Sequence, residues 1–184
     1  MYNTAVGHAA GAAVTTGVDN TLIGGLAGDA ITTGSGNVAV GKSALTADTL
    51  GKDSVAIGQN ALFSQNFTSS TSTYNVAVGK NAGLAVTTGV QNTLIGGLAG
   101  DALTDADANV AIGYAALSAN TIGSKSIAIG NGSLFRQNPA SAVDMYNVSI
   151  GHSAGEFIST GIQNTIIGGL AGDALTTGNY NTTL

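Results

Sequence analysis

Three copies of one phrase contain the residues most able to do chemistry. Residues 20–30 read NTLIGGLAGDA, residues 92–102 repeat this phrase, and residues 164–174 read NTIIGGLAGDA. Glycines followed by an acid raise two hypotheses, a phosphate-binding loop and a calcium site. A Walker-type loop needs G-x-x-x-x-G-K-[ST], but Gly28 is followed by Asp29, which would repel phosphate. A phosphate-binding loop is therefore not expected.

The calcium hypothesis fails on spacing. A calcium-binding β-roll carries GGxGxDxUx in successive nine-residue turns, so that ligands from neighbouring turns converge. Asp29, Asp101 and Asp173 are far apart instead, about 19 Å for four stacked strands. Only a threefold axis could bring copies of one Asp together. We expect structural roles, glycine at a corner and aspartate at a turn, and we expect no metal and no cofactor.

The two histidines give no better case for catalysis. His8 and His152 occupy a repeat position that is filled elsewhere by residues typical of a solvent-facing site, namely Lys42, Gln59, Lys80, Tyr114 and Asn131. No Ser–His–Asp set can be argued, because each candidate is the ordinary occupant of a repeated position. The sequence therefore predicts no catalytic residues and no enzyme.

The composition excludes several further classes of function. The chain has 184 residues with 28 Gly, one Pro, no Cys and no Trp, and only 8% of its residues are charged, against a usual quarter. The net charge is −5 and the five basic residues are scattered singly, so nucleic-acid binding is not expected. The absence of cysteine excludes disulfides and thiolate metal sites. No stretch resembles a signal peptide or approaches the ~20 apolar residues of a membrane helix, so membrane insertion is not expected.

An internal repeat explains the recurring phrase. A motif of the form [NS]-[TVI]-x-[VI]-G recurs ten times, at spacings of 17, 17, 17 and then 21 residues. Its glycines are Gly7, Gly24, Gly41, Gly58, Gly79, Gly96, Gly113, Gly130, Gly151 and Gly168. Each motif opens one coil of the chain, and every fourth coil is slightly longer than the others. Four coils make a superrepeat, so the superrepeats are 2–73, 74–145 and a partial one at 146–184, all within one domain over 1–184. Position 1 of a coil is the Asn or Ser that opens the motif, and the glycine is position 5.

The pattern within a coil favours parallel strands over helices. Position 4 is always Val or Ile, which suit a pleated sheet, and glycine at position 5 suits a tight corner. Glycine recurs too often for a helix, where each costs ~1 kcal/mol relative to Ala. Each coil therefore reads as a strand, a corner, a short strand and a corner. We predict an all-β protein, a parallel β-solenoid of about ten 17-residue coils and roughly 50 Å in length.

The strand motif is apolar on both faces, which predicts association. Positions 2 and 4 share one face. Position 3 takes the other, where Leu22, Leu94 and Ile166 recur every fourth coil and the other residues are alanines and Ser149. The interior of a coil covers only one face, whereas strands that are apolar on both faces are usually covered on both. Leu22, Leu94 and Ile166 are therefore our candidate oligomer interface. The alternative is that the alanines at position 3 are merely small and exposed.

The repeat motifs resemble a known family. NVAVGKSAL, SVAIGQNAL, NVAIGYAAL and SIAIGNGSL resemble the head repeats of YadA-like trimeric autotransporter adhesins, whose consensus is close to NSVAIGxxSxAxG. That resemblance implies a left-handed parallel β-roll and an intertwined trimer. The adhesin repeat is typically shorter than the coil of this chain, and the adhesin neck, stalk and anchor have no counterpart in this sequence. Arrays of YNTAVG…TTG…NTLIGG look more like the fibre or tail-associated proteins of bacteriophages, which implies a virion or an extracellular location.

The two 21-residue coils carry the candidate contact residues. Their extra residues lie within FSQNFTSSTST (63–73) and FRQNPASAVDM (135–145), at the same phase of the repeat. Insertions in a solenoid lie on one face, which is often the binding face. The candidate receptor contacts are Phe63, Phe67, Phe135, Arg136 and Pro139. The alternative is a bulge that tucks a Phe over an otherwise open groove.

The combined expectation is a structural and adhesive fibre segment. It would be the head or shaft of a trimeric phage tail fibre or surface adhesin that attaches to a host receptor or glycan. The first alternative is a subunit that stacks end to end into an extracellular filament. A remote alternative is an ice-binding solenoid, because Thr recurs at position 13, although a second parallel threonine row is missing.

Overall fold

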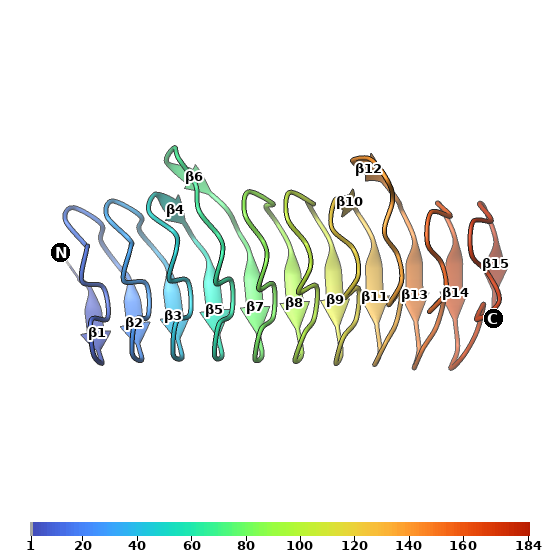
Figure 1. The fold of residues 1–184 in the computed structure, drawn as a ribbon, viewed down its shortest axis with the longest axis horizontal. Helices are drawn as coiled ribbons and strands as arrows, with labels where there is room; N and C mark the ends of the chain where they lie inside the picture. Colours follow the sequence, from blue (N-terminus) through green and yellow to red (C-terminus); the bar gives the residue numbers. More distant parts are fainter. Residues whose placement is uncertain (1) are drawn as a thin grey trace.

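The protein is a straight stack of coils. The computed structural model describes residues 2–184 and shows no helix among them (Figure 1). Its strands are β1 (Thr4–Val6), β2 (Thr21–Ile23), β3 (Val38–Val40), β4 (Gly51–Lys52), β5 (Val55–Ile57), β6 (Thr71–Ser72), β7 (Val76–Val78), β8 (Thr93–Ile95), β9 (Val110–Ile112), β10 (Gly123–Ser124), β11 (Ile127–Ile129), β12 (Val143–Asp144), β13 (Val148–Ile150), β14 (Thr165–Ile167) and β15 (Thr182–Thr183).

One parallel sheet runs the length of the rod. Its eleven strands follow the order β1-β2-β3-β5-β7-β8-β9-β11-β13-β14-β15, one strand from each coil. Equivalent positions pair throughout, as in Ala5 with Leu22 and Ala56 with Ala77 across one of the longer coils. The longer coils therefore leave the register of the sheet unchanged. The predicted all-β parallel solenoid is confirmed.

Among residues 2–184 the strands outside the main sheet lie near the ends of the third and fourth coils and of the seventh and eighth coils. There β4 pairs with β6 and β10 pairs with β12, and β6 and β12 rise above the rest of the rod (Figure 1). The short strand predicted after the corner glycine is absent from all ten coils of the described chain, because the chain there is a series of turns with left-handed backbone at positions 7 and 9, as at Leu26 (φ 61°) and Gly28 (φ 54°). Hydrogen bonds still join these turns coil to coil, such as Gly11 N to Ala27 O at 3.0 Å.

The ten glycines at position 5 lie where neighbouring coils approach closely and where the backbone has positive φ. All ten have φ between 130° and 142°, a region that side-chain-bearing residues avoid. A Cβ on Gly7 would also lie 2.5 Å from the carbonyl oxygen of Gly24 in the next coil. Each coil in turn makes the same approach, so a Cβ at nine of the ten positions would meet the backbone of its neighbour.

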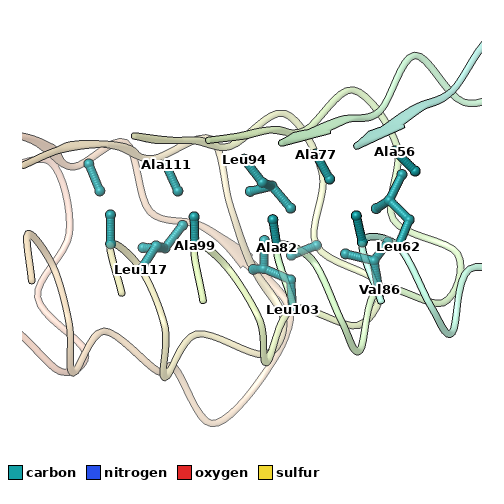
Figure 2. Packing of buried hydrophobic residues seen from close by; sticks show 14 of the residues in the cluster. Ala56, Leu62, Ala77, Ala82, Val86, Leu94, Ala99, Leu103, Ala111 and Leu117 are labelled. Atoms are coloured by element: carbon teal, nitrogen blue, oxygen red, sulfur yellow. The ribbon is translucent and has the colours of Figure 1, made fainter. Parts of the chain in front are cut away.

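The core is thin and is filled by matched side chains from two walls. Figure 2 shows Leu94 between Ala77 and Ala111 on the sheet side, facing side chains such as Leu103 on the opposite wall. Where position 3 is large, position 9 is glycine: a Cβ on Gly100 would lie 2.7 Å from Cδ2 of Leu94. In the third and fourth coils position 3 is Ala and position 9 is a buried Leu, namely Leu45, Leu62, Leu117 and Leu134. In the second, third and fourth coils, the large side chain thus comes either from position 3 or from position 9.

A ladder of buried asparagines at position 1 fixes the stacking of the coils. The Asn20 backbone N donates to Oδ1 of Asn3 at 2.9 Å, and the Asn37 backbone N donates to Oδ1 of Asn20 at 3.0 Å. The Asn20 Nδ2 also donates to the carbonyl of Gly34 at 2.9 Å. The ladder satisfies groups that would otherwise be unpaired in the interior, at roughly 1–3 kcal/mol each. Among residues 2–184 no buried side-chain polar atom lacks a partner.

Candidate functional site

The outward face of the main sheet consists only of Thr, Val and Ile in two parallel rows. Side chains alternate along a strand, so positions 2 and 4 point away from the core that position 3 enters. Position 4 of the strands supplies Val6, Ile23, Val40, Ile57, Val78, Ile95, Ile112, Ile129, Ile150 and Ile167. Position 2 adds Thr21, Val38, Val55, Val76, Thr93, Val110, Ile127, Val148 and Thr165, with Thr4 and Thr182 at the two ends. We call these two rows the β-branched face.

Much of this face is open to solvent in a single chain. Ile57 is 38% exposed and Ile95 is 37% exposed, and both lie near the middle of the rod. Eleven strands at the usual spacing give a face of roughly 50 Å by 10 Å, about 500 Å². Contiguous apolar patches of a few hundred Å² commonly mark interaction sites. No charged residue interrupts the two rows over residues 4–182.

The predicted interface residues lie on the other face. Leu22, Leu94 and Ile166 are fully buried inside a single chain, so a second copy cannot reach them. The expectation of an uncovered apolar face was sound, but it assigned the wrong positions to that face. The physical reason is that position 3 packs against glycine at position 9 of its own coil, as Leu94 does against Gly100, and this glycine leaves room inside the coil for a large side chain.

The predicted contact residues divide into buried and exposed groups. Phe67 and its equivalent Pro139 are buried at the base of the longer coils, so these two are not available as contacts. Pro139 Cδ lies 3.1 Å from the position that a Cβ on Gly123 would take. The alternative interpretation, in which the insertion tucks an apolar residue over the coil, therefore describes Phe67 and Pro139 correctly.

The other three predicted contacts are exposed but lie outside the projecting tips. Phe63 and Phe135 occupy position 10 of the two longer coils, before the projecting tips. Each side chain is a little over one third exposed. Arg136 places its guanidinium carbon 4.6 Å from the centroid of the Phe157 ring, an attractive cation–π geometry. The exposed tips themselves are residues 68–70 and 140–143, which are mostly small.

The acidic residues of the recurring phrase have structural partners. Thr46 donates a short hydrogen bond to Asp29, and Ser118 Oγ donates to Asp101 Oδ1 at 2.5 Å, in each case from the next coil. Within residues 2–184 no three His, Asp or Glu side chains come together as metal ligands. The arrangement of Asp29 and Asp101 corresponds to the turn role expected from the sequence.

The threonines at position 13 use their hydroxyls within the rod. Thr15 Oγ1 and Thr32 Oγ1 donate to the carbonyls of Thr32 and Thr49 in the following coils, each at 3.1 Å. Thr104 Oγ1 donates to Thr121 O in the same way. Hydroxyls held by the backbone are less available to order water, which disfavours this row as an ice-binding surface.

One ion pair lies on the surface of the second superrepeat. Lys125 Nζ lies 2.7 Å from Asp144 Oδ2, and both groups also contact the Tyr146 hydroxyl. Hydrogen bonding between the two charged groups raises the pKa of Lys125 and lowers that of Asp144. At Asp105, donation from the Thr87 and Thr88 hydroxyls lowers the pKa of the carboxyl group. All three groups are exposed, so their pKa shifts result from hydrogen bonds at the surface and do not indicate a reactive centre.

No family model matches the chain, and neither the curated proteins nor the solved structures contain a match. The described residues include no helix long and apolar enough to cross a membrane. The β-branched face is the candidate site because its partly exposed Thr, Val and Ile side chains form two uninterrupted rows.

Proposed function

We propose that this chain is a structural segment of a homo-oligomeric fibre whose copies pack through the β-branched face. The single observation that carries the proposal is the uninterrupted double row of Thr, Val and Ile on an open sheet. Fully burying one Val or Ile contributes about 1.5–3 kcal/mol, and the rows repeat this gain along the whole rod.

The geometry of the face favours a copy of the same chain as its partner. Side chains in each row recur once per coil, at a spacing of about 4.8 Å. A second rod has the same spacing, so its side chains can interdigitate along the full length, whereas an unrelated surface would lose register after a few coils. Rotational symmetry closes such an assembly. A trimer is the form that the resemblance to YadA-like head repeats implies.

An adhesive role extends the structural one. A stiff rod with laddered hydrogen bonds suits the head or shaft of a phage tail fibre or a surface adhesin, in the virion or outside the cell. In this proposal the exposed corners, including Phe63 and Phe135, meet a host receptor or glycan.

The test is the mass of the protein in solution, measured by light scattering on a size-exclusion column. We expect a species of three times the 17.9 kDa chain. Ile95→Lys should convert it to a monomer, because burying an uncompensated ammonium in the interface is unfavourable. Asn131→Lys, at an exposed position of a kind that already holds Lys42 and Lys80, is the matched control and should leave the mass unchanged.

Two outcomes would favour other functions. Large rods that grow with protein concentration would favour the end-to-end filament. A clean monomer of the unmodified chain would contradict the proposed interface.

A further inference from the structure

The ladder of side chains at position 6 has a gap in the second coil of each superrepeat. The residues at these gaps are Gly25, Gly97 and Gly169. At Gly97 the gap lies between Lys80 of the preceding coil and Tyr114 of the following coil, both of which are exposed. A pocket of about 290 Å³ opens at this point, and its lining consists of Lys80, Asn81, Gly97, Leu98 and Tyr114.

Tyr114 forms an aromatic wall of the pocket. A Cβ placed on Gly97 would lie 3.5 Å from Cδ2 and 3.8 Å from Cε2 of the Tyr114 ring, so the ring borders the glycine backbone directly. The side chain remains 58% exposed. A ring held against the backbone with so much surface in solvent offers a flat face to a ligand. Leu98 adds a second apolar surface.

The polar groups of the pocket are donors without strong internal partners. Lys80 has no carboxylate within ion-pairing distance among residues 2–184, where the single ion pair is Lys125 with Asp144. Asn81 Oδ1 accepts a hydrogen bond from Asn60 Nδ2 at 3.1 Å. The Asn81 Nδ2 hydrogens are therefore left to donate, and no acidic side chain lines the pocket.

We propose that this pocket binds one acidic sugar, a pyranose that carries a carboxylate. The Lys80 ammonium would pair with the carboxylate, since charge-assisted hydrogen bonds are the strong ones. The Tyr114 ring would cover the C–H face of the sugar, because the negative face of an aromatic ring attracts the partly positive hydrogens. Asn81 Nδ2 would donate to a hydroxyl oxygen.

Other ligands fit this lining less well. Inorganic phosphate has no apolar face to use Tyr114 and Leu98. The pocket volume is just below the usual range for small-molecule sites, about 300–1,000 Å³, which favours a single sugar ring over a larger nucleotide. The binding site belongs to one chain, so the proposal does not need the oligomer; only a role of the sugar in attachment rests on the proposed function.

The chain contains its own control for this pocket. Gly25 occupies the same position within an identical eleven-residue phrase. Its neighbours at position 6 are His8 and Lys42, and position 7 of the preceding coil is Ala9 instead of Asn81. The first superrepeat therefore lacks both the aromatic wall and the amide donor, and we expect no sugar binding there.

The first experiment measures sugar binding to the intact protein by saturation-transfer NMR and by calorimetry. The probes are D-glucuronic acid, D-galacturonic acid and N-acetylneuraminic acid, with D-glucose and D-galactose as counterparts of the two uronic acids that lack the carboxylate. We expect at least one acid to bind with a Kd on the order of millimolar, and its neutral counterpart to bind at least about tenfold more weakly. No binding of any acid, or equal binding of acid and neutral sugar, would overturn the proposal.

Substitutions then place the bound sugar. Gly97→Gln should abolish binding by filling the gap, and Gln is compatible with position 6 because Gln59 already stands there. Gly25→Gln should bind as the unmodified chain does, and Lys80→Gln and Tyr114→Ala should each weaken binding about tenfold or more. Binding that survives Gly97→Gln would overturn the proposed location. The solution mass of every variant is recorded in parallel, so a failure of the oligomer proposal is separate from a failure of sugar binding.

Discussion

The two longer coils close their interiors with different chemistry at equivalent positions. The first junction consists of Asp48, Ser54, Gln65, Thr73 and Asn75, and the second consists of their counterparts one superrepeat later, Asn120, Ser126, Gln137, Met145 and Asn147. All ten residues are buried. In both junctions a glutamine accepts from the next asparagine, as Gln65 Oε1 does from Asn75 Nδ2 and Gln137 Oε1 from Asn147 Nδ2, each at 2.9 Å.

The first junction holds an ionisable group, whereas the second is neutral. Asp48 Oδ1 accepts from the Gly51 backbone N at 3.0 Å, and Asp48 Oδ2 accepts from Gln65 Nε2 at 2.6 Å. Asn120 instead exchanges two hydrogen bonds with Gly123 alone, at 2.9 and 2.7 Å. The buried Met145 stands where Thr73 bonds to Ser54.

The comparison shows that the coil needs a polar closure here but does not need a charge. Burial raises the pKa of the Asp48 carboxyl from its ordinary value of 3.8, and the hydrogen bonds from Gln65 and the backbone partly oppose that shift. The second junction reaches full hydrogen bonding with no such penalty. The stability of the first junction should therefore depend on pH, while that of the second should not.

The largest difference between the junctions should follow from removing the glutamine. Gln65→Met leaves the Asp48 carboxylate without its side-chain donor and leaves Asn75 Nδ2 with the Gly89 carbonyl as its one remaining acceptor. We expect the free energy of unfolding to fall by about 3 kcal/mol at pH 7, since a buried charge that loses a partner is costly. The measurement is urea denaturation followed by circular dichroism, with hydrogen exchange of the Asn75 amide as a local probe.

Gln137→Met is the matched control for this substitution. It removes one hydrogen bond from Asn147 Nδ2 and two from Ser126 Oγ. It leaves no buried charge without a partner, so a smaller loss of about 1–2 kcal/mol is expected. Equal losses for the two variants would contradict the claim that the charge distinguishes the junctions.

Exchanging the acid should transfer the pH dependence. The folded-state pKa of Asp48 is raised, so its contribution favours folding below pH 3.8 and is lost as pH rises through the folded-state value. Asp48→Asn should remove that loss, so the free energy of unfolding should no longer fall as the pH rises. The check is denaturation at half-unit steps from pH 4 to pH 8.

The reciprocal variant tests the same idea from the other side. Asn120→Asp should introduce a decline of stability with rising pH, because Gln137 Nε2 donates to Ser126 at 3.0 Å and not to position 120. A flat profile for Asn120→Asp would show that the second junction admits a carboxylate without cost. Asp105 and Asp144 have lowered pKa values, so their contributions are lost below pH 3.8, outside this window.

The sequence predicted the framework of these junctions but not their interiors. Strict periodicity at positions 1, 4 and 5 specifies a stack of parallel strands, and the common phase of the two longer coils predicts that both project from one side. It could not show that Asp48 meets Gln65, because they belong to neighbouring coils whose facing side chains depend on the turns. The buried Phe67 was likewise indistinguishable from an exposed contact residue.

The sequence contains a pattern that could have shown which face of the sheet points inward. Strand alternation separates positions 2 and 4 from position 3 but does not say which set is inside. Volume does: Leu22, Leu94 and Ile166 at position 3 always occur with glycine at position 9, while Ala at position 3 in the third and fourth coils occurs with Leu there. Such exchange of volume between two positions indicates that both face one narrow core.

The smallest expected difference concerns the surface beside the second junction. Lys125, Asp144 and Tyr146 form a charged cluster, and the equivalent residues of the first superrepeat are Asp53, Ser72 and Tyr74. Asp144→Ser therefore gives the second region the uncharged residue of the first. Exposed ion pairs gain little in water and lose side-chain entropy, so we expect no measurable change in the free energy of unfolding at physiological salt. The pKa of Lys125 should fall toward its ordinary value, because the hydrogen bond from Lys125 Nζ to Asp144 is the main cause of its rise; NMR titration of the lysine side chain would detect this. A clear loss of stability that persists at high salt would mean that Asp144 supports the β10–β12 pair through more than its charge.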